Sequence, residues 1–307
     1  MREDLASSLE RIGAMATAVL PDLDALPDAL GHIRGHRQEP AVFAAYYDLV
    51  FALQRKDLAA AAALWRRVLM RAAAEPSPRL MRYGAADLGE DAERFHRLAA
   101  MGMSDPPVFD EPSGQDWRKF QATAPAALEL LAREHPAWAE ELDALVVWTI
   151  AAAPGPQGVG FSGGSSMMTW GAVLVNAAAS VDRISVLGVL VHEATHLLLL
   201  GLSRSEPLVL NPASERFQTG ARPTPRPMNA LYHSTYVSGR MARLWQEILG
   251  QCPDELSAAE RASLEQSTVL QLDRFRQGYE VIRRHARLAP LGLGLIEEAH
   301  EAMAPAS

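Results

Sequence analysis

The segment that most constrains the fold is VLVHEATHLLLLGL, residues 189–202. It is almost wholly apolar, yet His192, Glu193 and His196 lie in its middle. A segment this apolar is expected to be buried, and a buried polar group costs free energy unless another group bonds to it. The sequence therefore predicts a central helix on which these three side chains share a partner.

The spacing of the two histidines indicates a metal ion as that partner. Residues four apart lie on one face of a helix, with Cβ atoms about 5–6 Å from each other. His192 and His196 can therefore bind one ion, while Glu193 projects in a neighbouring direction; this is the HExxH pattern. A chance occurrence would more often fall on an exposed surface than between stretches rich in leucine and valine.

Two histidines need a third ligand, and the sequence leaves alternatives open. Leu202 stands where the metzincin pattern requires a histidine, which excludes that class. Glu215 lies 19 residues after His196, at the spacing of gluzincin-type zinc peptidases. His233 lies in an apolar helical stretch that follows a proline-rich segment. A histidine on such a face is usually a core residue, but beside an incomplete site His233 is the preferred ligand.

The pattern of the remaining chain predicts a mostly α fold with a small β-sheet, of the α+β class. Stretches rich in alanine and leucine at 41–54 and 57–73 predict helices, and further helical stretches follow Pro227. The segments 144–153 and 161–178 predict a short sheet. In this fold the metal site is expected on the central HExxH helix, facing a second helix.

The predicted domain organisation has a soft boundary near residue 135. A helical N-terminal region would occupy 1–135, and the HExxH metal-binding catalytic region 136–307, with a single domain as the alternative. Residues 203–227 hold five prolines and predict a long ordered loop.

Composition excludes several classes of protein. The chain has 37 acidic against 29 basic residues, a net charge of -8, which argues against a nucleic-acid-binding protein. A single cysteine, Cys252, allows no internal disulfide and fits a reducing compartment. The N-terminus lacks a signal-like apolar stretch, and no segment has the ~18 uninterrupted apolar residues of a membrane span. We therefore expect a cytoplasmic protein that binds neither nucleic acid nor membrane.

Three blocks of the sequence resemble one family, the 2-oxoglutarate-dependent HExxH-type peptide β-hydroxylases, which modify ribosomally made precursor peptides. The blocks are FSGGSSMMTWGAVLV, LGVLVHEATHLLL and TGARPTPRPMNALYH, and the resemblance covers roughly residues 160–240. In the third block the family has Ser-Pro-Trp-Arg, three residues, Arg-Pro and a short apolar run ending in His. Arg222, Arg226, Pro227 and His233 match it, whereas Thr-Gly-Ala at 219–221 replaces Ser-Pro-Trp.

The resemblance implies a ligand set and a reaction. The Fe(II) ligands it implies are His192, His196 and His233. Three ligands leave three positions on an octahedral ion, two for the 2-oxoacid and one for dioxygen. Arg226 and Arg222 would bind the distal carboxylate of 2-oxoglutarate, since guanidinium offers a bidentate fork. Glu193 would orient a ligand or substrate group, and Ser162 would line the groove beside an extended peptide. The implied activity is hydroxylation at the β-carbon of a precursor-peptide residue.

Two other functions remain open at this point. In a gluzincin-type zinc metallopeptidase, His192, His196 and Glu215 would hold zinc while Glu193 activates water. In a non-catalytic peptide-binding or structural module, four ligands would close the metal site. The peptidase would have no use for 2-oxoglutarate, and the closed site would leave no ligand position for water or substrate.

Overall fold

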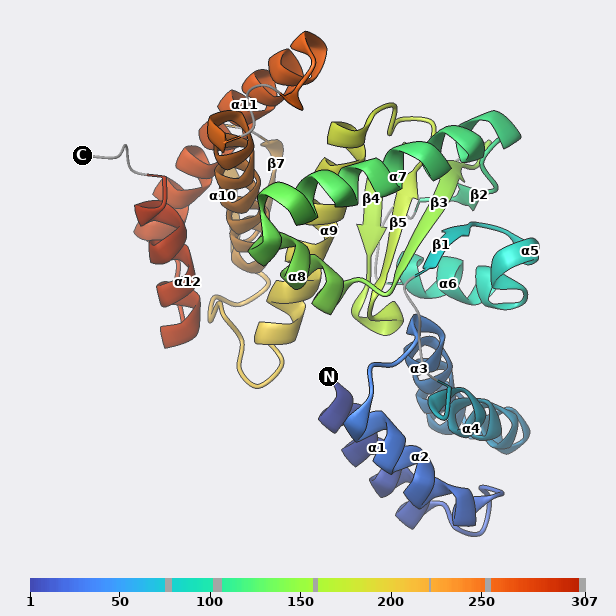
Figure 1. Cartoon of the computed structure of the whole chain (residues 1–307). Helices are drawn as coiled ribbons and strands as arrows, with labels where there is room; N and C mark the ends of the chain where they lie inside the picture. Colours follow the sequence, from blue (N-terminus) through green and yellow to red (C-terminus); the bar gives the residue numbers. More distant parts are fainter. Residues whose placement is uncertain (75–78, 102–106, 157–159, 221, 252–254, 304–307) are drawn as a thin grey trace. The chain divides into compact units, whose positions relative to one another are not determined.

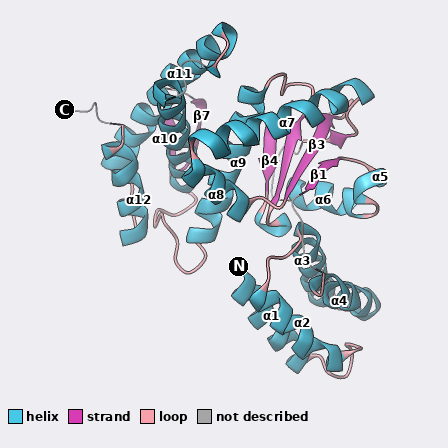
Figure 2. Cartoon of the chain, viewed as in Figure 1, coloured by secondary structure: helices cyan, strands magenta, loops and turns pink. Residues whose placement is uncertain are grey.

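A computed structural model describes residues 1–74, 79–101, 107–156, 160–220, 222–251 and 255–303 (Figure 1). The described residues are 67% helical, far above the roughly one-third helix of an average protein, and they include a small mixed sheet, so the α+β prediction is confirmed (Figure 2). It divides into two compact units. The first is Met1–Thr123 with Leu142–Val181, and the second is Ala124–Glu141 with Asp182–Ser307.

The first unit combines helices with the sheet. Its helices are α1 (Arg2–Met15), α2 (Leu26–Gly35), α3 (Pro40–Gln54), α4 (Leu58–Ala72), α5 (Ala85–Leu88) and α6 (Asp91–Ala100). Helices α3 and α4 confirm the predictions for 41–54 and 57–73. Each buries an apolar stripe in one core that includes Leu49 and Trp65. Two further helices, α7 (Gly114–Glu134) and α8 (Pro136–Leu145), run from one unit into the other.

The sheet has the strand order β1-β3-β5-β4, with β2 paired to β3. Its strands are β1 (Arg79–Arg82), β2 (Phe109–Asp110), β3 (Trp148–Pro154), β4 (Gly163–Ser165) and β5 (Ala172–Asn176). The central strands β3 and β5 are parallel and buried, which explains their nearly continuous apolar sequences. Because β3 pairs with β1, residues 142–181 belong with the N-terminal helices. The domain boundary predicted near residue 135 stays a prediction.

The HExxH segment forms α9 (Arg183–Leu202) in the second unit. Asp182 and Ser185 form a capping box at its start, which satisfies backbone N–H groups that have no partner within the helix. Among the described residues, α9 alone is long and apolar enough to cross a membrane, and 56% of its most apolar window is buried inside the protein. A core helix has the same length and composition, so this property gives only weak evidence of a membrane span.

The predicted loop at 203–227 is wrong in part, because its second half forms a hairpin. Strands β6 (Arg216–Thr219) and β7 (Arg222–Pro227) pair in antiparallel fashion. Proline cannot donate a backbone hydrogen bond and is tolerated on a strand only where that donor would face away from the partner. The β7 sequence RPTPRP has prolines at every second position, and β7 is one of only two strands in its sheet, so it has a free edge that tolerates proline.

Three further helices complete the second unit: α10 (Met228–Gln251), α11 (Ala258–His285) and α12 (Pro290–Glu301). Glycines let them approach closely. A Cβ added at Gly188 of α9 would lie 3.3 Å from the Trp245 ring of α10, and one at Gly239 of α10 would lie 2.7 Å from the Phe275 ring of α11. These contacts fix α9, α10 and α11 against each other and so fix the histidines that α9 and α10 carry.

Candidate metal centre

The three predicted histidine ligands lie together in the second unit. His192 and His196 are one turn apart on α9, and their ring centroids are 4.9 Å apart. His233, in the second turn of α10, stacks on His196 with a centroid distance of 6.1 Å and an angle of 19° between the rings. All three side chains are partly buried. The three imidazoles of α9 and α10 therefore form a cluster, and the metal site itself stays a prediction.

The cluster is close to, but not in, the geometry of a bound metal. A metal–nitrogen distance of about 2.0–2.1 Å places the ring centres of two histidine ligands about 4.5–5.3 Å apart. The His192–His196 pair fits this range, whereas the His196–His233 pair is about 1 Å too long and its rings are nearly parallel. Accordingly, no group of three or more His, Cys, Asp or Glu side chains in the described part of the chain is placed to hold a metal ion. Binding would require the His233 ring to turn.

Burial favours the neutral form of His196 and His233. Burial is the main cause that lowers the pKa of His196 to about 3, and the neighbouring His192 and His233 contribute to this shift. Burial also lowers the pKa of His233. Neutral imidazole is the form that binds metal, so the cluster suits a cation.

Glu193 is buried in α9, with 6% of its surface exposed. It follows His192 directly and projects from a different side of the helix. A buried carboxylate must be bonded, which suits a group that orients a neighbour. Its two predicted roles, as an orienting group or as a hydrolytic base, both stay predictions.

Glu215, the alternative third ligand, is held elsewhere. Its Oε2 accepts a hydrogen bond of 2.8 Å from the Asn211 amide, and its Oε1 accepts one of 2.8 Å from the Arg287 guanidinium. Asn211 also bonds the backbone of His285 and Arg287, which ties the loop before β6 to the end of α11. Zinc binding by Glu215 would therefore require these hydrogen bonds to Asn211 and Arg287 to break.

Arg226 lies on β7, opposite Phe217 of β6, and its side chain is exposed. It lines a small cavity of about 20 Å³ between the hairpin and the start of α10. The other lining residues are Phe217, Thr219, Thr224, Leu231 and Ser234. Ser234 follows His233 in α10, so the guanidinium lies near the helical segment that carries the third histidine. A guanidinium with three hydroxyl groups is suited to bind a carboxylate.

Sequence reasoning did not identify those hydroxyl residues. Thr219, Thr224 and Ser234 come together only through the hairpin, which the proline content concealed. Two other predicted residues stay untested. Arg222 begins β7, but its side chain lies outside the described part of the chain. Ser162 belongs to the first unit, where its backbone carbonyl accepts a hydrogen bond of 2.9 Å from the Asn176 N–H.

No protein-family model matches the chain, and no curated protein matches it. The resemblance to the peptide β-hydroxylases therefore rests on the three sequence blocks, and a function can be proposed only from the residues themselves.

Proposed function

We propose that this protein is an Fe(II)- and 2-oxoglutarate-dependent dioxygenase that hydroxylates the β-carbon of a residue in a ribosomally made precursor peptide. The observation that carries the proposal is that the His233 ring lies beside the His196 ring, while Glu215 accepts a hydrogen bond from Arg287. A third histidine favours an oxygenase, whereas the zinc peptidase needs the glutamate.

The chain's own residues have distinct tasks in this proposal. His192, His196 and His233 would hold the ion, and Arg226 would bind the distal carboxylate of 2-oxoglutarate. When bound, Fe(II) and 2-oxoglutarate would supply the oxidising power needed to hydroxylate a C–H bond with dioxygen. Glu193 would orient a ligand or a substrate group from its buried position.

The cavity around Arg226 supports its task. Charge-assisted hydrogen bonds from a guanidinium are about twice as strong as neutral ones, and hydroxyl groups of Thr219, Thr224 and Ser234 would complete the carboxylate's partners. The family resemblance supports a precursor peptide as the substrate, and the composition supports a cytoplasmic location.

The test is an anaerobic titration of the Fe(II)-loaded protein with 2-oxoglutarate, which follows the weak visible band of a chelated iron–oxoacid complex. We expect a band in the wild type, and roughly tenfold weaker 2-oxoglutarate binding in Arg226→Ala. Arg216→Ala is the matched control, because Arg216 is an exposed arginine of the facing strand. The absence of a band from a protein that retains zinc and cleaves peptides would overturn the proposal.

A further inference from the structure

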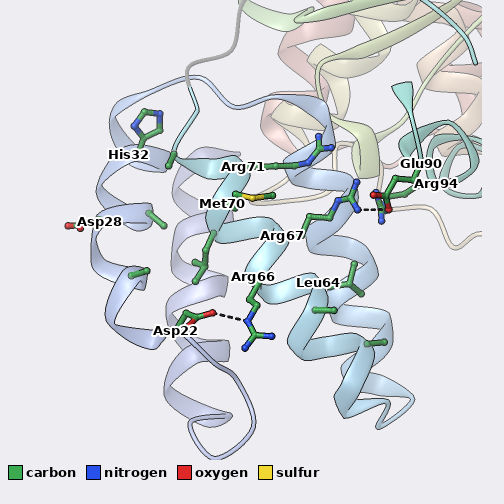
Figure 3. Close-up of a pocket in the computed structure, with 16 residues that line it drawn as sticks. Asp22, Asp28, His32, Leu64, Arg66, Arg67, Met70, Arg71, Glu90 and Arg94 are labelled. Atoms are coloured by element: carbon green, nitrogen blue, oxygen red, sulfur yellow. Dashed lines mark hydrogen bonds and ion pairs between the residues drawn. The ribbon is translucent and has the colours of Figure 1, made fainter. Parts of the chain in front are cut away.

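A groove of about 1070 Å³ lies between α2 and α4 in the first unit (Figure 3). Its charged side chains balance one another, because four arginines are matched by four carboxylates. They are Arg66, Arg67, Arg71 and Arg94 against Asp22, Asp28, Glu90 and the buried Asp91. Figure 3 shows two of these pairs, Arg66 with Asp22 and Arg67 with Glu90. The groove therefore favours neither an anion nor a cation.

A more specific arrangement lies in the second unit, where the start of α12 is fixed to the loop that follows α9. Val209 and Leu288 form an isolated antiparallel β-bridge, and the Leu208 carbonyl accepts a hydrogen bond of 3.1 Å from the Ala289 N–H. A Cβ added at Gly292, in the first turn of α12, would collide with the Leu208 carbonyl oxygen. Glycine at this position therefore lets α12 approach the loop closely.

Tyr232 connects α10 to this part of α12. Its hydroxyl donates a buried hydrogen bond of 2.7 Å to the Gly292 carbonyl. The Tyr232 side chain is fully buried, in the same hydrophobic core as Leu199 of α9 and Leu208 of the loop. One tyrosine thus joins α10 to the segments that hold the end of α9.

The position of His233 depends on how α10 is rotated about its axis. His233 follows Tyr232 directly, and the two ring centroids are 6.5 Å apart at an angle of 65°. A side chain that reaches about 6 Å from a helix axis moves about 1 Å when the helix rotates by ~10°. A movement of this size matches the excess of about 1 Å in the separation of the His196 and His233 rings. A hydrogen bond that opposes rotation of α10 therefore affects whether His233 can reach a shared ion.

We propose that Tyr232 is a positioning residue of the metal centre. Its hydrogen bond to Gly292 fixes the rotation of α10 and keeps the His233 ring within reach of an ion bound by His192 and His196. Tyr232 acts through His233 and is not itself a ligand, as second-shell groups do at other metal sites. The inference rests on the metal centre of the proposed function, to which it adds a residue that the HExxH pattern does not indicate.

The experiment measures the Kd of Co(II) for the metal-free full chain from the visible absorption of the bound ion. Tyr232→Phe keeps the ring and removes the hydroxyl, whereas Gly292→Ala displaces the acceptor. Gly294→Ala is the matched control, because it lies in the same helix and no described atom lies within 4 Å of a Cβ added there. Circular dichroism checks that each variant keeps the wild-type fold.

A second comparison repeats Tyr232→Phe in a His233→Ala background. If Tyr232 acts through His233, loss of the hydroxyl has no further effect on Co(II) binding once the imidazole is absent. A general loss of packing would weaken the remaining two-histidine site as well. The double variant therefore separates a positioning role from a merely structural one.

We expect Tyr232→Phe and Gly292→Ala to weaken Co(II) binding by roughly tenfold, and Gly294→Ala by less than about twofold. The absorption of bound Co(II) should shift towards that of His233→Ala, because water replaces the third imidazole. The proposal is overturned if either folded variant binds Co(II) as tightly as wild type while His233→Ala binds it weakly. It is also overturned if Tyr232→Phe has the same effect in both backgrounds. Wild-type affinity in His233→Ala would instead overturn the metal centre of the proposed function, and this inference with it.

Discussion

The imidazole of His233 stacks on that of His196, with 6.1 Å between the ring centroids. The two residues are far apart in sequence and belong to different helices, α10 and α9. The distance between their rings depends on how these helices pack. The first predictions therefore concern residues that hold α10 against α11 and α12.

Tyr232→Phe should lower stability. The Tyr232 hydroxyl donates a buried hydrogen bond of 2.7 Å to the Gly292 carbonyl of α12, and burial raises the pKa of this tyrosine. Its loss leaves the carbonyl without that donor, at an expected cost of about 1–3 kcal/mol. Chemical denaturation measures the change in unfolding free energy. An unchanged value would show that the bond contributes nothing.

Gly278→Ala should destabilise the protein by disturbing the close packing of α11 on α10. A Cβ at this position would lie 2.9 Å from Thr235 Cβ, two residues beyond His233. Such overpacking costs about 1–3 kcal/mol. The control is Gly250→Ala, because nothing lies within 4 Å of a Cβ added there and alanine favours a helix. We expect a lower melting temperature than that of wild type in Gly278→Ala but not in Gly250→Ala. A melting temperature of Gly278→Ala equal to that of wild type would contradict this packing.

Glu260→Gln should lower stability in a pH-dependent way. Hydrogen bonding to Arg183, at 2.7 Å, is the main cause that lowers the pKa of Glu260 from 4.5 to about 2, and the Ser257 cap contributes. Since the folded state has the lower pKa, the stabilisation is complete above about pH 4.5 and is lost as the pH falls towards 2. The variant should therefore be about 1–3 kcal/mol less stable than wild type near pH 7, and the difference should shrink in acid.

Urea unfolding at several pH values tests this dependence. Glu265→Gln is the control, because Glu265 is an exposed residue of the same helix. A stability difference for Glu260→Gln that stays constant from pH 7 to pH 3 would rule out the ion pair as its cause.

Much of the helical framework could be predicted from the sequence, because local chemistry determines where helices begin. Asp182 with Ser185 and Ser257 with Glu260 form capping boxes, and Pro136 opens α8. The pairing of His192 with His196 also follows from local geometry, since four residues make about one turn. These features depend on few distant contacts.

Features that depend on distant contacts could not be predicted. The sequence of the β6–β7 hairpin predicts a loop because prolines usually break strands, although their spacing of two permits an edge strand. The cavity that Arg226 lines beside this hairpin is equally hidden from the sequence. Strands β1 and β2 were missed because they are only four and two residues long. The distance of His233 from His196 is set by helix packing, which no sequence pattern reports.

The most direct test of the account is to titrate the metal-free protein with Co(II) and follow the visible absorption of the bound ion. The account predicts saturation at one ion per chain in the wild type and in Glu215→Ala. It predicts at least about tenfold weaker binding in His233→Ala, with His285→Ala, an exposed histidine of α11, as the control. Tight binding that survives in His233→Ala but is lost in Glu215→Ala would contradict the account and assign the third ligand to the glutamate.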